Sequence, residues 1–296
     1  MSKNENIINK IVVVAMLSAL CCAGTFVQIR MPAGDFVHLG NFVMIVSALL
    51  LGGIEGGLVG SLGMGLYDVI FYTTKPSTIL RTFILKFLIG FIVGFLFRLV
   101  LKKKANTKRL LFISSGVLFS LFVFSLVLFI IGDKSQFSFD TGLNSVLNLN
   151  LFGSEKAIGI SLYIPIFSFV FFVGTLLAGI FSYKLSKRSQ AALFSISVAV
   201  FVNIIGEFLL RWLLEGFMVQ DSNFTVSLIT ATSKIPGSII TGFVSVLLAV
   251  LIYEPIYKAV KNTSLFKDDT AYFNSLENED EVKEEAKEDV LNAKEA

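Results

Sequence analysis

The chain has 296 residues, of which 54% are apolar and only 16% are charged, and its mean hydropathy is +0.77. A typical soluble domain has roughly 25% charged residues, so this composition excludes an ordinary soluble globular protein and indicates a protein of the lipid bilayer. The net charge of +3 hides an uneven distribution, because residues 267–296 hold 11 acidic and 4 basic side chains, whereas residues 1–266 hold 21 basic and 11 acidic ones.

Eight apolar segments follow one another along the chain. Several approach or exceed the roughly 20 residues that a helix needs to cross a bilayer. Lipid offers no partner to backbone N–H and C=O groups, so the segments must be helices. We therefore predict an all-α integral membrane protein built as a helical bundle. The segments comprise about residues 9–29, 37–52, 56–73, 79–101, 110–131, 158–183, 191–215 and 227–257.

The first segment carries a stripe of small residues. Ala15, Ala19 and Ala23 recur every four positions and so share one face of a helix. Small residues at this spacing let two helices approach closely. The spacing alone leaves the partner open between another helix of this chain and another subunit, with packing inside the chain as the default.

The second and third segments are joined by a glycine-rich stretch. Residues 52–65 contain seven glycines, and no Lys-Ser or Lys-Thr pair follows them as it would in a phosphate-binding loop. We interpret these glycines as close-packing positions between helices.

Basic residues are distributed unevenly among the connections between segments. If the segments cross the membrane in turn, one side receives 13 Lys and Arg residues and the other receives 5. The positive-inside rule places the richer side, and with it both termini, in the cytoplasm. Eight crossings agree with this orientation, and six would agree equally.

A late segment carries a stripe of polar residues. Residues 202–217 read VNIIGEFLLRWLLEGF, in which Asn203, Glu207, Arg211 and Glu215 fall four positions apart. On a helix these side chains form one slightly drifting line. Charged groups at membrane depth are costly and usually face the bundle interior or a water-filled cavity.

The other embedded charges lie in the same half of the membrane. Lys86 is roughly 12 Å and Lys234 about 10 Å below the outer ends of their segments, at 1.5 Å per residue. Asp68, beside Tyr67, and Arg81 flank the outer connection between the third and fourth segments. This gathering predicts a pocket that opens to the outside and offers both donors and acceptors.

A structural interpretation of the stripe stays open beside the pocket. Glu207 stands four positions before Arg211, which is a favourable arrangement for an ion pair on a helix. Such a pair can hold helices together, and it can also line a pocket.

Several of these stretches resemble a known family. Residues 31–69 read MPAGDFVHLGNFVMIVSALLLGGIEGGLVGSLGMGLYDV, residues 75–98 read KPSTILRTFILKFLIGFIVGFLFR, and residues 234–256 read KIPGSIITGFVSVLLAVLIYEPI. Together with the polar stripe they resemble the substrate-binding S component of energy-coupling factor (ECF) transporters, and in particular the riboflavin-type family. The resemblance covers roughly residues 10–101 and 190–260.

The resemblance implies a fold and a function. S components are six-helix membrane proteins that capture a vitamin or its precursor from outside with very high affinity. They associate with a transmembrane coupling subunit and two cytosolic ATPases, and they are thought to topple in the membrane to release the substrate. In the family the small-residue stripe of the first helix is the docking face, which assigns that role to Ala15, Ala19 and Ala23.

The resemblance also implies a substrate lid after the first helix, where this chain has MPAGDFVHLGN. His38, the only histidine, is expected to contact the substrate or to anchor this loop. Asn41 stands where many relatives carry an acidic residue, so the chemistry of the lid is expected to differ. The predicted substrate-binding residues are His38, Asn41, Tyr67, Asp68, Lys86, Asn203, Glu207, Arg211 and Lys234.

This chain is longer than its relatives. Residues from about 104 to 188 resemble an insertion of two further helices with an external loop. Such an insertion would preserve the topology of the six core helices. We expect residues 1–266 to form the transmembrane domain and the acidic residues 267–296 to form a cytosolic tail.

The predicted function is that of a non-catalytic subunit of an ECF-type importer in the cell membrane. One alternative is a self-sufficient carrier or channel. An intramembrane enzyme is less well supported, because it would need catalytic groups that face each other, and the sequence does not indicate them. One histidine and two adjacent cysteines give no metal-ligand spacing, so we expect no metal or other cofactor, and we expect no nucleic-acid partner. The predicted partners are the coupling subunit, two ATPases, a vitamin and the lipid bilayer.

Overall fold

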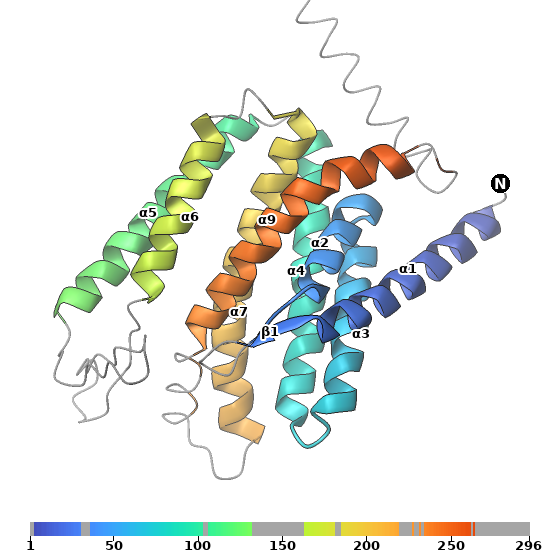
Figure 1. Ribbon diagram of the computed structural model, residues 1–296, viewed down its shortest axis with the longest axis horizontal. Coiled ribbons are helices and arrows are strands. Elements are labelled where there is room, and N and C mark those ends of the chain that lie inside the picture. The colour runs from blue at the N-terminus through green and yellow to red at the C-terminus, as the bar shows by residue number, and fades with distance from the viewer. Residues whose placement is uncertain are drawn as a thin grey trace, which may run out of the picture.

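The computed structural model describes residues 3–30, 36–102, 106–131, 163–180, 185–218, 227, 231, 234–261 and 263. This described part consists of eight helices and one short β-hairpin (Figure 1). The prediction of an all-α membrane protein is therefore confirmed. The elements are α1 (Lys3–Phe26), β1 (Gln28–Arg30), β2 (Phe36–His38), α2 (Gly40–Leu51), α3 (Gly53–Phe71), α4 (Pro76–Lys102), α5 (Thr107–Ile131), α6 (Tyr163–Ile180), α7 (Lys187–Met218) and α9 (Ile235–Val260).

Six of these helices are long and apolar enough to cross a membrane, namely α1, α3, α4, α5, α7 and α9. The helix α2 has only 12 residues. Each of the eight apolar segments expected from the sequence overlaps one of the described helices, although the ends differ by several residues. The last helix begins at Ile235 rather than near 227, with Pro236 in its first turn, where the missing N–H of proline breaks no hydrogen bond.

The central layer consists of α3, α4 and α7, with α2 and α9 packed against them. Glycines bring α3 and α4 into close contact, as expected. A Cβ atom on Gly90 of α4 would lie 2.6 Å from the carbonyl carbon of Gly56, and one on Gly57 would lie 2.8 Å from the carbonyl oxygen of Phe87. Because a side chain at either position would push the two helices apart, the glycines fix their distance.

The turn between α2 and α3 depends on a single glycine. Gly52 has φ of 115°, a conformation that residues with a side chain rarely adopt. The guanidinium of Arg98, on α4, donates a hydrogen bond of 2.7 Å to the carbonyl of Leu51. This turn therefore reverses the chain tightly and holds the short α2 against the central layer.

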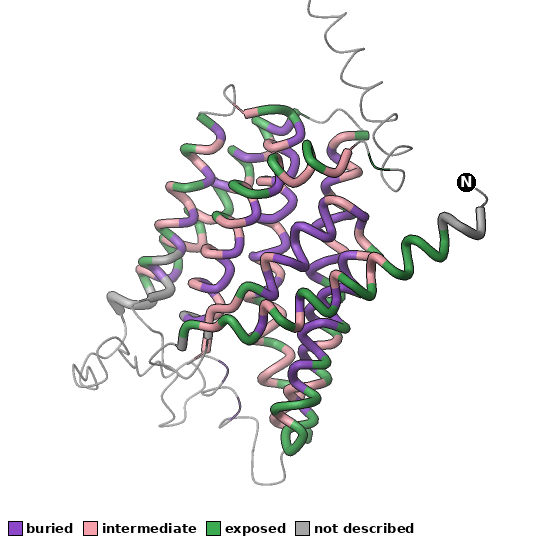
Figure 2. Tube along the Cα trace, turned by 45° about the vertical axis from the view of Figure 1, so that its right-hand side comes forward, coloured by how far each residue is buried: buried purple, intermediate pink, exposed green. Residues whose placement is uncertain are grey.

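The first helix leaves the bundle along most of its length. In Figures 1 and 2 its N-terminal half extends away from the other helices, and most of it is exposed. Only its last turns pack against α2 and α3, where Cys21 and Thr25 are buried. The chain then returns through β1 and β2, which pair antiparallel with Gln28 opposite His38.

The helices α5 and α6 form a hairpin on the side of the bundle opposite to α1 (Figure 1). They pack extensively against each other and less extensively against α7 and α9. A contact to the rest of the bundle is made by Phe171 on α6, whose ring lies edge-on to that of Phe243 at 5.5 Å. The loop between the two helices and the acidic tail, for which sequence-based expectations were stated, lie outside the described residues.

This arrangement makes the hairpin a candidate for removal. Deletion of residues 110–183, with the basic ends rejoined, is expected to leave a folded protein that still binds substrate. The newly exposed faces of α7 and α9 are apolar, and lipid can cover them as the hairpin does. The measurement is size-exclusion chromatography and substrate titration of the shortened protein, and aggregation would show that the hairpin belongs to the core.

Candidate functional site

A large polar cavity opens where several helices begin or end at one end of the bundle. Its volume is about 940 Å³, near the upper end of the roughly 300–1,000 Å³ typical of small-molecule sites. The C-terminal ends of α1, α3 and α7 and the N-terminal ends of α2, α4 and α9 contribute to its wall. Of the nine predicted substrate-binding residues, eight line it: His38, Asn41, Asp68, Lys86, Asn203, Glu207, Arg211 and Lys234.

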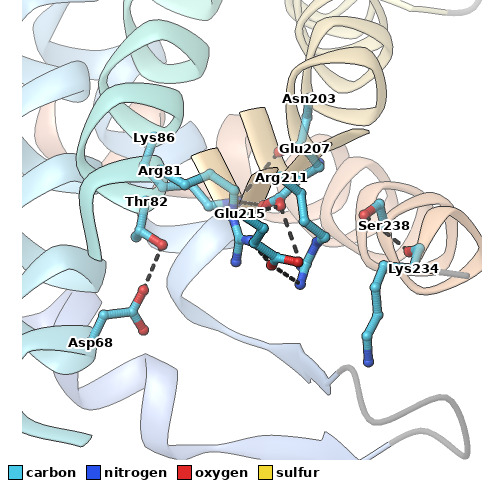
Figure 3. Close-up of polar contacts among 10 residues, drawn as sticks. All are labelled: Asp68, Arg81, Thr82, Lys86, Asn203, Glu207, Arg211, Glu215, Lys234 and Ser238. Atoms are coloured by element: carbon cyan, nitrogen blue, oxygen red, sulfur yellow. Dashed lines mark hydrogen bonds and ion pairs between the residues drawn. The ribbon is translucent and has the colours of Figure 1, made fainter. Parts of the chain in front are cut away.

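An ion network between α4 and α7 forms one wall (Figure 3). The carboxylate of Glu207 lies 3.1 Å from Nε of Arg81, 3.6 Å from Nη2 of Arg211 and 3.7 Å from Nζ of Lys86. Glu215 lies 3.7 Å from a guanidinium nitrogen of both Arg81 and Arg211. We call these five residues the α4–α7 network.

The α4–α7 network includes three of the four residues of the polar stripe, for which a pocket lining and a structural ion pair were both left open. All four stripe residues line the cavity. The pair of Glu207 with Arg211 within α7 is present, but the cation nearest to Glu207 is Arg81 on the neighbouring helix. The stripe therefore joins α7 to α4 and forms a polar wall at the same time.

The deep end of the cavity is polar as well. The ammonium of Lys86 donates a hydrogen bond of 3.3 Å to the side-chain oxygen of Asn203. Both side chains are buried, as is Asn41 at the start of α2. Thr241 on α9 completes this part of the lining, so the deep end offers donors and acceptors from four helices.

His38 reaches the cavity from strand β2, outside the helices that cross the membrane. The pKa of its imidazole is lowered to about 3, mainly because the ring is buried, and the nearby Lys86 ammonium lowers this pKa further. The ring is therefore neutral at physiological pH and presents one donor and one acceptor.

Two neighbours on α3 have different environments. Asp68 lines the cavity and accepts a hydrogen bond from the hydroxyl of Thr82 on α4. Tyr67 does not line it, because its ring packs edge-on against Phe26 at 5.1 Å and beside Phe71 at 4.7 Å. Tyr67 thus anchors the end of α1 to α3 and supports the cavity from behind.

Sequence reasoning recognised Arg81 and Glu215 as embedded charges but did not assign them to the site. It also passed over Thr82. Their position could have been found from the spacing on α4, where Thr82 precedes Lys86 and Arg81 precedes the apolar Leu85 by four positions. Residues four apart lie on one face of a helix.

Apolar side chains close the cavity toward the other end of the bundle. Met44, Leu85, Val93 and Ile196, from α2, α4 and α7, are almost completely buried there. They belong to one apolar cluster that extends to Phe97 and Tyr253, whose rings meet edge to face at 5.7 Å. Among the described residues, this cluster lies between the cavity and the opposite end of the bundle.

The small-residue stripe on α1 has no cover in the described structure. Ala15, Ala19 and Ala23 are all exposed, as are the large apolar side chains of Ile11, Met16 and other residues around them. The default expectation that the stripe packs within the chain is not met among the described residues.

The described ranges contain no cluster of three His, Cys, Asp or Glu side chains of the kind that holds a metal ion. Comparison with known proteins gives a match to a protein family. Residues 5–150 match the family described as ECF-type riboflavin transporter, S component. No curated protein and no solved structure is similar enough to the chain to count as a match.

Proposed function

The chain belongs to the family of ECF-type riboflavin transporter S components, and from this premise we propose that it captures a water-soluble vitamin or precursor for an ATP-driven importer. The observation that carries the proposal is the cavity of about 940 Å³, which is lined by charged and amide side chains and closed at one end. Riboflavin, as the substrate in the family's description, is the first candidate ligand.

The cavity is expected to face the outside. The connections at the opposite end of the bundle, between α4 and α5 and between α6 and α7, are the basic ones, and basic connections stay in the cytoplasm. This orientation puts both termini in the cytoplasm. The substrate would then enter past Lys75, which lines the cavity before the first turn of α4.

The energy for uptake is expected to come from partner subunits. The sequence has no phosphate-binding loop with its Lys-Ser or Lys-Thr pair. We propose that α1 docks through Ala15, Ala19 and Ala23 onto a transmembrane coupling subunit that carries two cytosolic ATPases. The exposed stripe supports this, because small residues permit close approach of a second helix.

A self-sufficient carrier or channel is the alternative. Such a protein needs polar groups on both sides of its binding site, whereas the side chains next to this cavity on its inner side form the apolar cluster around Leu85 and Ile196. The described structure therefore favours a binding subunit that releases its substrate only with the help of partners.

Riboflavin binding to the purified protein tests the proposal. Titration in detergent, followed by quenching of flavin fluorescence, is expected to give a submicromolar dissociation constant. Proteoliposomes that hold the chain without any ATPase are expected to accumulate no riboflavin. ATP-independent accumulation would favour the carrier instead, and mass spectrometry of small molecules that co-purify with the chain would identify another vitamin if riboflavin does not bind.

A further inference from the structure

We propose that a second cavity, which lies between the α5–α6 hairpin and α7, binds one acyl chain of a membrane lipid. This apolar cavity has a volume of about 200 Å³ and shares no lining residue with the polar cavity described above. Residues of α5, α6, α7 and α9 form its wall. The inference concerns a ligand other than the substrate, so it does not depend on the proposed function.

The lining of the apolar cavity selects against polar ligands. Eight of its ten described residues are apolar, none is charged, and the other two are Ser168 and Ser197. Both serines are buried, and the hydroxyl of Ser197 donates a hydrogen bond of 2.8 Å to the carbonyl of Leu193 on its own helix. Apolar cavities of this kind stay dry and take up apolar molecules. A hydrocarbon is therefore the class of ligand that fits.

Aromatic contacts of the hairpin keep the apolar cavity open. Within the hairpin, the rings of Phe119 on α5 and Phe172 on α6 lie 5.0 Å apart. Toward the bundle, the ring of Phe171 meets that of Phe243 on α9 at 5.5 Å. These contacts set the distance between the hairpin and α7, so closure of the space would break them. Side chains that face an empty space lose dispersion contacts, and a bound acyl chain would restore these contacts.

The apolar cavity has an exposed side near the middle of α7. Val200 and Ile239 in its wall are buried, whereas Ile205 is 43% exposed. Ile205 lies about 27 Å from the start of α7 at Lys187 and about 20 Å from its end at Met218, at 1.5 Å per residue. The hydrocarbon core of a bilayer is about 30 Å thick, and α7 is long and apolar enough to span it. The exposed side therefore faces lipid hydrocarbon, and an acyl chain can enter there.

The volume of the apolar cavity suits a segment of one chain. An apolar cavity of about 150 Å³ can bind benzene, so about 200 Å³ has room for a chain segment of roughly eight carbon atoms. The helix α7 separates this segment from the substrate site, because Asn203 lines the polar cavity and the next residue, Ile204, lines the apolar one. A bound chain would thus support the helix that carries the polar stripe, without contact with the substrate.

Native mass spectrometry of the full chain tests the inference. The protein is reconstituted into vesicles of dioleoyl phosphatidylcholine, and the lipids that stay bound after release into detergent are counted. The unmodified protein is expected to retain one lipid. Ser197→Leu places a longer apolar side chain in the cavity, and it is expected to weaken lipid binding at least about tenfold, which corresponds to 1.4 kcal/mol.

The matched control is Ser120→Leu on α5. The hydroxyl of Ser120 also donates to a carbonyl four residues earlier, that of Gly116, but this side chain is exposed and does not line the apolar cavity. The control variant should retain the lipid as the unmodified protein does. Equal retention by Ser197→Leu and Ser120→Leu would overturn the inference, and so would the absence of a retained lipid from the unmodified protein.

A second variant covers the case in which Ser197→Leu does not fold. Ile205→Phe adds bulk at the exposed side of the apolar cavity rather than at its buried wall, so the bundle should tolerate it. This variant is also expected to lose the retained lipid. Retention at the level of the unmodified protein would count against the cavity as the lipid site.

Two further comparisons separate this site from other sites. Dioleoyl phosphatidylglycerol has the same chains and another headgroup, and it should be retained equally; a dependence on the headgroup would place the lipid elsewhere. Ser197→Leu should bind riboflavin as the unmodified protein does, because Ser197 does not line the polar cavity. Loss of riboflavin binding with the lipid still retained would assign the apolar cavity to the substrate instead. Failure of the lipid to bind would leave the proposed function intact.

Discussion

Replacement of Ala19 by Trp is expected to abolish substrate uptake by cells and to leave the affinity of the purified protein for its substrate nearly unchanged. Ala19 is exposed at the centre of the stripe that also contains Ala15 and Ala23. An indole ring at this position would hold a partner helix several ångströms away, and a helix interface of small residues tolerates no such gap. The α1 residue that lines the cavity is Thr25, six positions after Ala19 and on the buried side of the helix, so substrate binding should not change.

Uptake of labelled substrate into cells that also contain the ATPases and the coupling subunit is the primary measurement. Co-purification of these partners with the variant gives the second one. The matched control is Phe124→Trp on α5, where the side chain is 62% exposed on the far side of the bundle; it should take up substrate normally. If Ala19→Trp reduces affinity as much as uptake, the stripe serves internal packing rather than docking.

The helices could be predicted because their cause is local. Each apolar segment must satisfy its own backbone in lipid, so hydropathy alone identifies it. The predicted ends of the helices were less accurate than their presence, because the end of a helix depends on single residues. Pro236 lies in the first turn of α9. Residues 28–29 and 37–38, predicted as ends of two helical segments, belong instead to the paired strands 28–30 and 36–38. Three residues are too few for a strand pattern to be recognised.

The site was predictable where one helix carries it. Asn203, Glu207 and Arg211 share a face of α7 by their spacing, and the structure places all of them at the cavity. Pairing between helices was not predictable in this way. Lys86 and Asn203 are hydrogen-bonded although 117 residues separate them in the chain, and only the packing of α4 against α7 brings them together.

Tyr67 shows that the position of a residue along the sequence does not predict whether its side chain reaches the cavity. It was grouped with Asp68 because the two are adjacent, but successive residues on a helix point about 100° apart. Asp68 therefore lies at the cavity, and Tyr67 packs against Phe26 and Phe71. Membrane depth can be read from a sequence more easily than the direction of a side chain.

Replacement of Glu207 by Gln is expected to lower the stability of the protein strongly. The side chain keeps its shape but loses the charge that faces Arg81, Lys86 and Arg211 within 3.7 Å. Arg81 and Arg211 would then keep only the carboxylate of Glu215, and Lys86 would lose the carboxylate that it faces within the network. Removal of one partner from a buried ion pair costs roughly 3–5 kcal/mol, because the other charge stays buried without compensation. The melting temperature in detergent measures this loss.

Two further variants separate a charge effect from a packing effect. Glu215→Gln should cost less than Glu207→Gln, because Glu215 faces two cations rather than three. Lys86→Met in the Glu207→Gln background removes one cation, so the double variant should recover part of the lost stability. Together with the single variants Glu207→Gln and Lys86→Met, the double variant forms a cycle that gives the coupling energy between Lys86 and Glu207.

The affinity of the same preparation decides what Glu207 does in the site. One of its oxygens faces Arg81 and Arg211, and the other faces Lys86. We therefore expect Glu207 to hold these cations in position rather than to contact the ligand, so that affinity should fall by less than about tenfold, or 1.4 kcal/mol. An unchanged melting temperature with a larger loss of affinity would contradict this, and it would assign Glu207 a direct hydrogen bond to the substrate.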